Sequence, residues 1–448
     1  MDISLPALVS ILALVILVGI SCVNEDLNVG FLGIAFGIIV GGVFAGTPAS
    51  KVMNAFPLSL FMILVGVTFL FGMAQTNGTM EKLTAYSIRA CKGNTALVPI
   101  IIYILATFIT TIGPGNIAGC ALMAPVAMAI ASKVKMPAFL MTLLVVGACN
   151  GAAFSPFAPT GIISNGIIAK CAPELGIPAD YLNTLAWKIH FNSTIAQGFV
   201  NIGGFFVMGG LKWIREQKGA ALEIDELAPK PEPFNAAQTT TLLLVAILII
   251  LVVVPGLPGV KGTLPKTITN MLSNVGSISF VLSIVLMLTG YGDSKAAVKV
   301  MPWSVIMMVC GVSVLIDVMD KAGGLNFLVE VMASVAGPTT ICFWTAFVPA
   351  VISAYSSSSG VVMPMFLPMT PGLVELTGGD PIAIISAIDV GSHLVDTSPL
   401  STLGALCIAS AGEEEDKGVL FRKLLIWGLS MSIVSGIVCY VFFGILGF

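Results

Sequence analysis

A succession of long apolar blocks constrains this chain more than any other feature. Their uninterrupted apolar runs are about 16–25 residues long, which suits membrane-spanning helices and not the alternating ten-residue strands of a membrane barrel. Hydrophobic residues make up 57% of the chain and charged residues only 10%, too few to cover the surface of a soluble protein. The sequence therefore predicts an all-α polytopic membrane protein. Six blocks precede a polar break and six follow it, at 5–22, 28–46, 57–75, 97–132, 137–169 and 186–211, then at 238–256, 275–292, 302–320, 338–375, 381–411 and 421–446.

Two blocks in each half carry helix-breaking or small polar residues at their centres. Block 97–132 contains Gly113-Pro114-Gly115-Asn116, and block 338–375 contains the serine run 356–359. Backbone that leaves the helix at membrane depth must be buried in protein or line a wet cavity. We therefore predict re-entrant hairpins at 97–132 and 338–375. The blocks that follow them, 137–169 and 381–411, are predicted to be broken helices, because proline and small polar residues interrupt each one.

The two halves of the chain form an internal repeat. At an offset of 245, six of the fourteen positions from Pro57 to Leu70 are identical, where about one would match by chance. At an offset of 243, Ser155-Pro156 matches Ser398-Pro399, Asn116 lies opposite Ser359, and Asn150 lies opposite His393. If each hairpin enters and leaves on one side, each half crosses the membrane five times. An odd number of crossings makes the repeats inverted.

The distribution of basic residues predicts the orientation. The face that contains the central break collects fourteen of the twenty Lys and Arg residues, which places this face in the cytoplasm. We expect a first repeat at 1–211, a cytoplasmic linker at 212–236 and a second repeat at 237–448, with both termini outside. The piece 80–92 is amphipathic and is expected to lie at the interface.

The predicted breaks define a candidate anion site. All basic residues lie at block ends or in loops, so the midplane offers an anion only hydroxyls, amides and helix N-termini. The alternative is a set of kinks with Ser/Thr packing contacts, but four breaks in symmetric positions favour a site. The residues expected to bind substrate are Gly115, Asn116, Ser155, Thr160, Ser358, Ser359, Ser398 and Thr402.

Three ionisable residues lie in or near the apolar block 381–411, namely Asp389, His393 and Asp396. A charge in a membrane span is a functional hypothesis by default. The residues at positions i and i+4, Asp389 and His393, would share a helix face, so the three could relay a proton or hold a cation. The alternative is that Asp396 is an N-cap and His393 a packed polar residue. We interpret Asp317 as structural, and we place His190 at the outer edge of its span without a function.

At this point several motifs resemble a known family. Phe56-Pro57, the run 64–71 and Ala74-Gln75-Thr76-Asn77-Gly78-Thr79 are similar to the N-terminal signature of bacterial dicarboxylate carriers of the malonate-carrier (MatC) type. The run 151–156, followed by 161–165, is similar to the second signature of that family. The resemblance covers about the first 210 residues directly and the second half mainly through the repeat.

The resemblance implies membership of the ion-transporter superfamily, which includes the divalent anion:sodium symporters. It implies a homodimer in the bacterial inner (plasma) membrane, with a scaffold and a mobile transport domain in each protomer. It further implies an elevator movement and Na⁺- or H⁺-coupled uptake of small dicarboxylates. The symporters carry Ser-Asn-Thr at each hairpin tip, where this chain has Gly115-Asn116-Ile117 and Ser358-Ser359-Gly360. For a coupling Na⁺ we expect Asn116, Gly161, Ser359 and Asp396 as ligands.

Other function classes stay open or are disfavoured. An oxyanion or cation antiporter of the same superfamily is the closest alternative, and a channel or an intramembrane enzyme is a more distant one. The net charge of -3 carries no nucleic-acid footprint. The sequence has no P-loop, which argues against a self-contained ATP-driven pump. We expect no cofactor beyond the coupling ion, with the bilayer and a small organic anion as partners.

Overall fold

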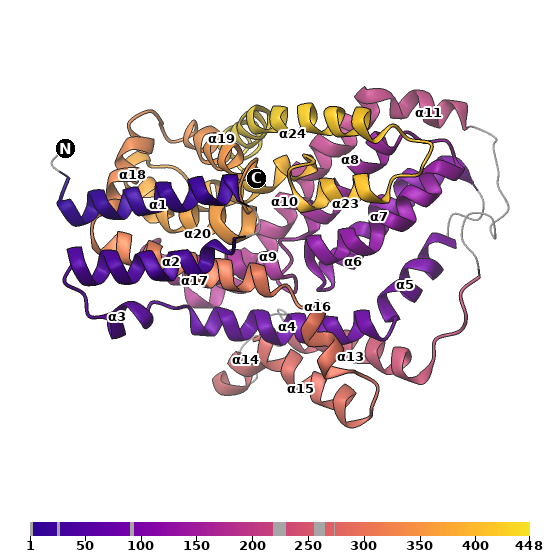
Figure 1. Cartoon of the computed structure of the whole chain (residues 1–448), viewed down its shortest axis with the longest axis horizontal. Coiled ribbons are helices and arrows are strands. Elements are labelled where there is room, and N and C mark those ends of the chain that lie inside the picture. The colour runs from indigo at the N-terminus through magenta and orange to yellow at the C-terminus, as the bar shows by residue number, and fades with distance from the viewer. Residues whose placement is uncertain (1–2, 25–26, 90–93, 218–229, 255–264, 273) are drawn as a thin grey trace.

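The computed structural model describes residues 3–24, 27–89, 94–217, 230–254, 265–272 and 274–448 (Figure 1). Within these ranges every regular element is a helix, which confirms the all-α prediction there. Eight of the described helices are long and apolar enough to cross a membrane. About half of the predicted linker 212–236, namely residues 218–229, lies outside the described residues.

The first half contains the following helices, of which η1 and η5 are π-helical and η3 and η4 are 3₁₀-helical: α1 (Leu5–Val23), α2 (Val29–Ile39), η1 (Val40–Phe44), α3 (Ala49–Met53), α4 (Leu58–Thr76), α5 (Thr79–Ile88), η3 (Thr95–Leu97), α6 (Val98–Thr111), α7 (Gly115–Lys133), α8 (Ala138–Ala152), α9 (Pro159–Cys171), η4 (Ala179–Tyr181), α10 (Leu182–Phe205), η5 (Phe206–Gly210) and α11 (Leu211–Glu216). At the start of the predicted linker, α11 continues as helix to Glu216.

The second half contains the following helices, of which η7 and η10 are π-helical and η8 and η9 are 3₁₀-helical: α13 (Ala236–Val253), α14 (Lys266–Leu272), α15 (Val275–Leu288), α16 (Ser294–Val300), α17 (Trp303–Lys321), α18 (Gly324–Ala333), α19 (Ile341–Ser353), η7 (Ser358–Val362), α20 (Met363–Phe366), η8 (Leu367–Met369), α21 (Thr370–Thr377), α22 (Pro381–Leu394), η9 (Val395–Thr397), α23 (Thr402–Ser410), α24 (Lys417–Cys439) and η10 (Tyr440–Ile445).

Short polar side chains fix where many of these helices begin. Asn28 caps α2, Asp380 caps α22 and Asp416 caps α24, each accepting hydrogen bonds from main-chain N–H groups of the first turn. Asn235 and Gln238 form a reciprocal capping box at α13. These caps satisfy main-chain donors that would otherwise be unpaired at helix ends near or inside an apolar phase.

The helices of the two halves recur at the offsets that the sequence shows. Helix α4 shifted by 245 gives the bounds of α17, and α5 shifted by 245 gives those of α18. Shifting α6, α8 and α9 by 243 gives the starts of α19, α22 and α23. Five helices of the first half therefore have a counterpart in the second half at the offsets that the sequence shows.

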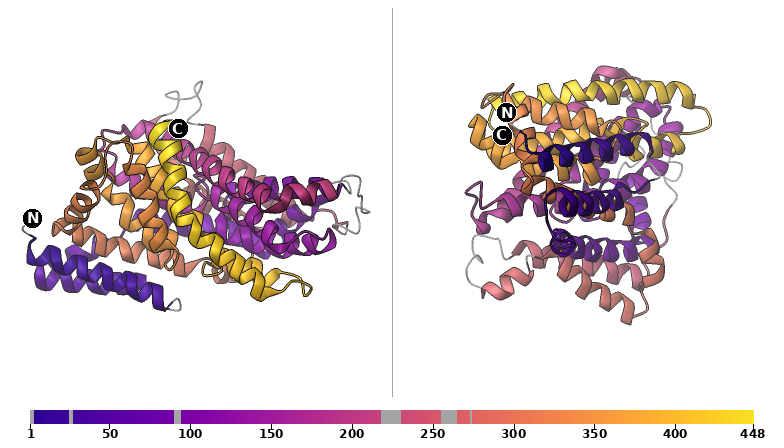
Figure 2. Two further views of the ribbon diagram at one scale, coloured as in Figure 1. Left: turned by 90° about the horizontal axis from the view of Figure 1, so that it is seen from above. Right: turned by 60° about the vertical axis from the view of Figure 1, so that its left-hand side comes forward.

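Helices from opposite halves cross at glycines. Helix α4 packs on α15 where Gly66 lies against the main-chain oxygen of Gly276, and α17 packs on α2 where Gly311 lies against Gly30. A Cβ atom at Gly66 or Gly311 would overlap the neighbouring backbone. Small residues allow such close helix packing in membranes, where burial of apolar surface cannot drive it. The α1 and α2 helices lie side by side along the same flank (Figure 2).

The hairpins enter the molecule from opposite ends of its long axis. In Figure 1 the N-terminus and α18 lie at the left, and α11 lies at the right. The hairpin formed by α6 and α7 comes from the side of α11, which we call the linker side. The hairpin formed by α19 and η7–α21 comes from the side of the N-terminus, which we call the terminal side. Both hairpins turn near the centre of the molecule.

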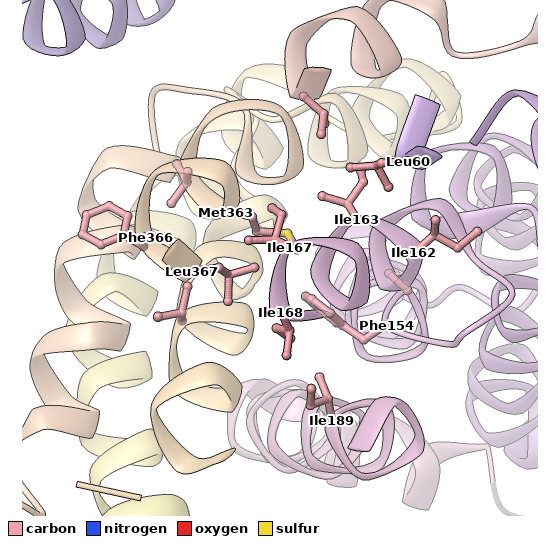
Figure 3. Packing of buried hydrophobic residues seen from close by; sticks show 14 of the residues in the cluster. Leu60, Phe154, Ile162, Ile163, Ile167, Ile168, Ile189, Met363, Phe366 and Leu367 are labelled. Atoms are coloured by element: carbon pink, nitrogen blue, oxygen red, sulfur yellow. The ribbon is translucent and has the colours of Figure 1, made fainter. Parts of the chain in front are cut away.

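Helix α9 closes the terminal side of the centre. Figure 3 shows Ile163 of α9 beside Leu60 of α4, and Ile167 of α9 beside Met363 of the second hairpin. Ile163 and Met363 are fully buried. This apolar contact separates the middle of the molecule from the terminal side.

Candidate functional site

A cavity of about 490 Å³ lies between the hairpin tips and the two broken helices. Six of the eight predicted anion-binding residues line it: Gly115, Asn116, Thr160, Ser358, Ser359 and Thr402. The other two, Ser155 and Ser398, are not among the lining residues. The cavity lining that the structure describes contains no Lys or Arg, and Asp396 is its one acidic residue.

Glycines make the first hairpin tip. Gly113 has φ 147° and Gly115 has φ 79°, both in the left-handed region that disfavours other residues. A Cβ atom at Gly113 would overlap the Phe71 ring of α4, and one at Gly115 would crowd the Pro159 ring. The tip therefore turns within three residues and packs directly against α4 and the start of α9.

Serines make the second tip. Ser357 is the N-cap of the helical stretch that begins at Ser358, and its hydroxyl accepts from the N–H of Gly360 at 3.0 Å. The neighbouring Ser356 hydroxyl lies 3.0 Å from that of Ser21, at the end of α1. The second tip therefore carries a cluster of hydroxyls where the first carries glycines and one amide.

Four helix N-termini converge on the cavity. Helix α7 begins at Gly115, α9 at Pro159, η7 at Ser358 and α23 at Thr402, and all four residues line the cavity. The N-terminus of a helix presents unpaired N–H groups and the positive end of its dipole. The cavity is therefore suited to an anion although its lining has no basic side chain.

A closed polar ring ties the two tips to the two broken helices. Asn116 donates to Asn150 Oδ1 at 3.0 Å, and Asn150 donates to the main-chain oxygen of His393 at 2.9 Å. The His393 Nε2 atom lies 3.0 Å from Ser359 Oγ. Thr160 Oγ1 closes the ring at 3.4 Å from both Ser359 Oγ and Asn116 Oδ1. Asn116 and Ser359, matched by the repeat, thus belong to one network.

Asp396 belongs to the second tip. Its Oδ1 atom accepts from Ser358 Oγ at 2.8 Å, and the Ser358 hydroxyl in turn accepts from Ser353 at 2.7 Å. Asp396 is only 4% exposed, so its carboxylate depends on hydrogen bonds from these hydroxyls and on a ligand in the cavity. The alternative interpretation of Asp396 as the N-cap of the following helix was wrong, because Ser401 caps α23.

Asp389 lies apart from the cavity. Its carboxylate accepts from Ser164 of α9 at 2.6 Å, while its other oxygen is buried with no hydrogen-bond partner in the structure. His393 Nδ1 contacts the main-chain oxygen of Asp389 at 3.2 Å and not its carboxylate. The expected Asp389–His393 relay therefore has no direct side-chain contact.

The structure uses Ser155 and Ser398 in the turns themselves. Ser155 donates to the main-chain oxygen of Thr111 at 2.7 Å, and Ser398 accepts from the N–H of Leu400 at 3.2 Å. Gly161 packs under Ser155 and Gly404 packs under Ser398, where a Cβ atom would overlap the main-chain oxygen. Neither glycine lines the cavity.

Sequence reasoning missed several site residues and misplaced one. Asn150 and Ser353 complete the polar contacts above, and the repeat offset that pairs Asn150 with His393 was the available signal for Asn150. Thr68, Phe71 and Met308 line the cavity from α4 and α17. His190 is not at the edge of its span, because it lies eight residues into α10 and is only 5% exposed. Asp317 pairs with Lys321 at 2.5 Å near the end of α17, as the structural interpretation predicted.

The cavity offers oxygen atoms that could bind a cation. Among the described residues, no group of three or more His, Cys, Asp or Glu side chains is placed to hold a metal ion. A hard cation such as Na⁺ can instead be held by hydroxyl, amide and main-chain oxygens with a single carboxylate. Asn116, Ser359 and Asp396, three of the four residues expected to bind Na⁺, offer such oxygens at the cavity.

The cavity is open toward the linker side. Its lining from α4 runs from Thr68 to Gln75, the end of that helix nearest the linker side. The lining from α17 runs from Ser304 to Met308, again the linker-side end. Toward the terminal side, α9 packs on α4, where Gly166 lies against Leu60.

Two comparisons with known proteins agree with this arrangement. A crystal structure of the Alcanivorax borkumensis YdaH transporter matches over 98% of both chains at a TM-score of 0.60 and 18% identity, which shows a shared fold. No curated protein matches the sequence significantly. Residues 4–153 match the model of the dicarboxylate carrier protein MatC N-terminus. The predicted resemblance to dicarboxylate carriers of the MatC type is thus confirmed over residues 4–153, about the first third of the chain.

Proposed function

We propose that this protein is a secondary transporter that imports a small dicarboxylate together with Na⁺ or H⁺ by an elevator movement. The observation that carries the proposal is the cavity itself. Four helix N-termini, several hydroxyls and one amide surround it, with one acid and no Lys or Arg. The family match at residues 4–153 supports a dicarboxylate as substrate.

Charge explains why the uptake must be coupled. A dicarboxylate brings two negative charges into a cavity whose described lining already holds Asp396 and no base. Helix dipoles supply only about half a positive charge each. The four N-termini together offset about two of these three negative charges. We therefore propose that a cation or a proton enters with the substrate, and that Asn116, Ser359 and Asp396 bind it.

Ligand-induced stabilisation tests the proposal. We expect malonate or succinate to raise the melting temperature of the purified protein in Na⁺ buffer, because a ligand stabilises only the state that it binds. K⁺ buffer is the control, and uptake into proteoliposomes follows for each positive carboxylate. If Na⁺ or H⁺ alone shifts the melting temperature and no carboxylate does, the cation antiporter becomes the better function.

The repeated order of helices supports inverted repeats and alternating access. We propose that α1–α4 and α13–α17 form the scaffold of a homodimer, since α4–α15 and α2–α17 interlock at glycines. The hairpins with α8–α10 and α22–α24 would form the moving domain. In the present state α9 packs on α4, where Gly166 lies against Leu60. The repeat offsets map this pair onto Val305 of α17 and Ala409 of α23.

Crosslinking distinguishes the two states. A cysteine pair at Leu60 and Gly166 should form a disulfide in the state described here and stop transport. A pair at Val305 and Ala409 should crosslink only after the protein opens to the terminal side, so external substrate with a cation gradient should increase its yield. An elevator movement is excluded if the Leu60–Gly166 crosslink leaves uptake at full rate.

Labelling tests the predicted orientation. The nine native cysteines are first replaced. In that background, Glu232→Cys on the linker side should react with a membrane-impermeant maleimide only after the cells are permeabilised. The matched control, Ser334→Cys after α18, should react in intact cells, because both positions are exposed on opposite sides. The reverse pattern would place the termini in the cytoplasm.

A further inference from the structure

A stripe of buried polar side chains runs along α10, away from the cavity. His190, Ser193, Gln197 and Asn201, the α10 polar stripe, are each at most 5% exposed. None of the four lines the cavity. They follow one another at three or four residues, so they share one face of the helix.

The stripe holds most of the unpartnered polar atoms among the described residues. Eight buried side-chain nitrogen or oxygen atoms there have no hydrogen-bond partner, and five of them belong to the stripe: His190 Nδ1, Ser193 Oγ, Gln197 Nε2 and Oε1, and Asn201 Oδ1. Buried polar atoms in native proteins are almost always paired, with ordered water where protein groups are absent. In a membrane span the cost of leaving them unpaired is several kcal/mol per group.

The facing helix is shaped for this stripe. A Cβ atom at Gly147 of α8 would overlap the Asn201 side chain, and one at Gly151 would lie 3.5 Å from Gln197 Cβ. Glycines thus leave the room that polar side chains occupy between α8 and α10. Close to Gly151, the Thr194 hydroxyl donates to the Gly151 main-chain oxygen at 3.0 Å, so this neighbour is fully partnered.

The rise between successive stripe residues is close to the distance that a single bridging water molecule spans. A water that accepts or donates at both ends bridges about 5.5 Å, and one helical turn rises about 5.4 Å. The eleven residue-to-residue steps from His190 to Asn201 rise about 16 Å, roughly half of the apolar thickness of a bilayer. Asn192, on the adjacent face of α10, donates to Ser386 of α22 at 2.9 Å, one turn before Asp389.

We propose that the α10 polar stripe binds a file of ordered water through which protons move between the linker side and the level of Asp389, without passing through the substrate cavity. Each hop passes one proton along a hydrogen bond, so the waters are unchanged overall. Ionisable groups on the elements packed against α10 include Cys149, Lys170, Cys171, Asp180, Tyr181, Asp389 and His393, together with Tyr103 of α6, whose hydroxyl lies against Gly198. The proposal rests on the coupled transport proposed above and makes H⁺ one of the coupling ions.

Gln197→Met tests the route, because methionine keeps the length and removes both unpartnered atoms. In proteoliposomes with an internal pH dye, the variant should slow substrate-driven proton entry at least tenfold. Substrate exchange, which needs no net proton movement, should stay at the wild-type rate, as should the melting-temperature shift by substrate. Thr194→Val, which removes a partnered hydroxyl at the same interface, should leave all three unchanged.

Three outcomes overturn the route. Unchanged proton entry in Gln197→Met would show that the stripe does not carry protons. Loss of exchange together with proton entry would show that the stripe supports the substrate site instead. Uptake that is driven by Na⁺ with no proton entry in the wild type would refute the route and leave the proposed transporter intact. Independently, solid-state NMR should show magnetisation transfer from water to the Gln197 side-chain amide. Absence of this transfer would contradict the proposal that ordered water lies along the stripe.

Discussion

Replacing Asp396 with asparagine is expected to lower cation-coupled uptake about a hundredfold or more. Asp396 is the one acid in the described cavity lining, and its carboxylate is held by Ser358 at 2.8 Å. In the proposed cation site Asp396 pairs with the coupling cation, and loss of one partner from a buried charge pair costs about 3–5 kcal/mol, where 1.4 kcal/mol is a factor of ten. Asparagine keeps the shape of the side chain and its bond to Ser358, so the loss isolates the charge.

The measurement is initial uptake in proteoliposomes as the concentration of the coupling cation is varied. We expect the variant to need far more cation or to lose the dependence on it. Asp317→Asn is the matched control, since Asp317 is a partly exposed acid paired with Lys321 near the end of α17. An Asp396→Asn variant with wild-type uptake and cation dependence would move the coupling site elsewhere, first to Asp389.

The sequence predicted the hairpins and breaks because their signals are local and repeated. Glycine and proline together at 113–115 disfavour a continuous helix, and α6 ends at Thr111 in agreement with that pattern. The offset of 243 then places Ser359 opposite Asn116, and the structure connects both to Thr160. Helix breaks in equivalent places are thus readable without any knowledge of which helices are neighbours.

The sequence did not predict which neighbours the individual side chains contact. Helical spacing puts Asp389 and His393 on one face, but α9 covers that face and its Ser164 takes the Asp389 carboxylate. Ser155 and Ser398 lie beside unpaired main-chain groups at the breaks, and short hydroxyl side chains bond such groups locally. Both serines lie at the breaks, as predicted. They do not line the cavity, because their hydroxyls form hydrogen bonds with main-chain groups at the breaks instead.

The polar face of α10 shows a further limit. His190 begins a polar pattern that spacing alone assigns to one face, yet the chain gives no sign that glycines 147 and 151 of α8 cover it. Which helix covers a face depends on the tertiary arrangement, which periodicity does not encode. For that reason the sequence singled out only His190 of the stripe and assigned it no function.

Replacing Asn116 with alanine is expected to weaken the apparent affinity for the dicarboxylate at least tenfold. The amide of Asn116 lies at the start of α7, bonds Asn150 at 3.0 Å and receives the Ile117 N–H at 3.0 Å. Charge-assisted hydrogen bonds to a carboxylate contribute about 1.5–3 kcal/mol each, and 1.4 kcal/mol is a factor of ten. Alanine also leaves Asn150 without its donor, so the geometry of the first tip relaxes at the same time.

The decisive measurement compares three variants by substrate titration of thermal stability and of uptake. Asn116→Ala should lose affinity, and Ser359→Ala should lose less, because Ser359 supplies one hydroxyl among several at the second tip. Thr107→Val should keep wild-type affinity, because the Thr107 hydroxyl bonds only within α6, to Tyr103 at 2.9 Å. If Asn116→Ala and Ser359→Ala fold, insert and bind with unchanged affinity and cation dependence, the anion does not lie between the tips. The group around Asp389 and His393 would then be the next site to test.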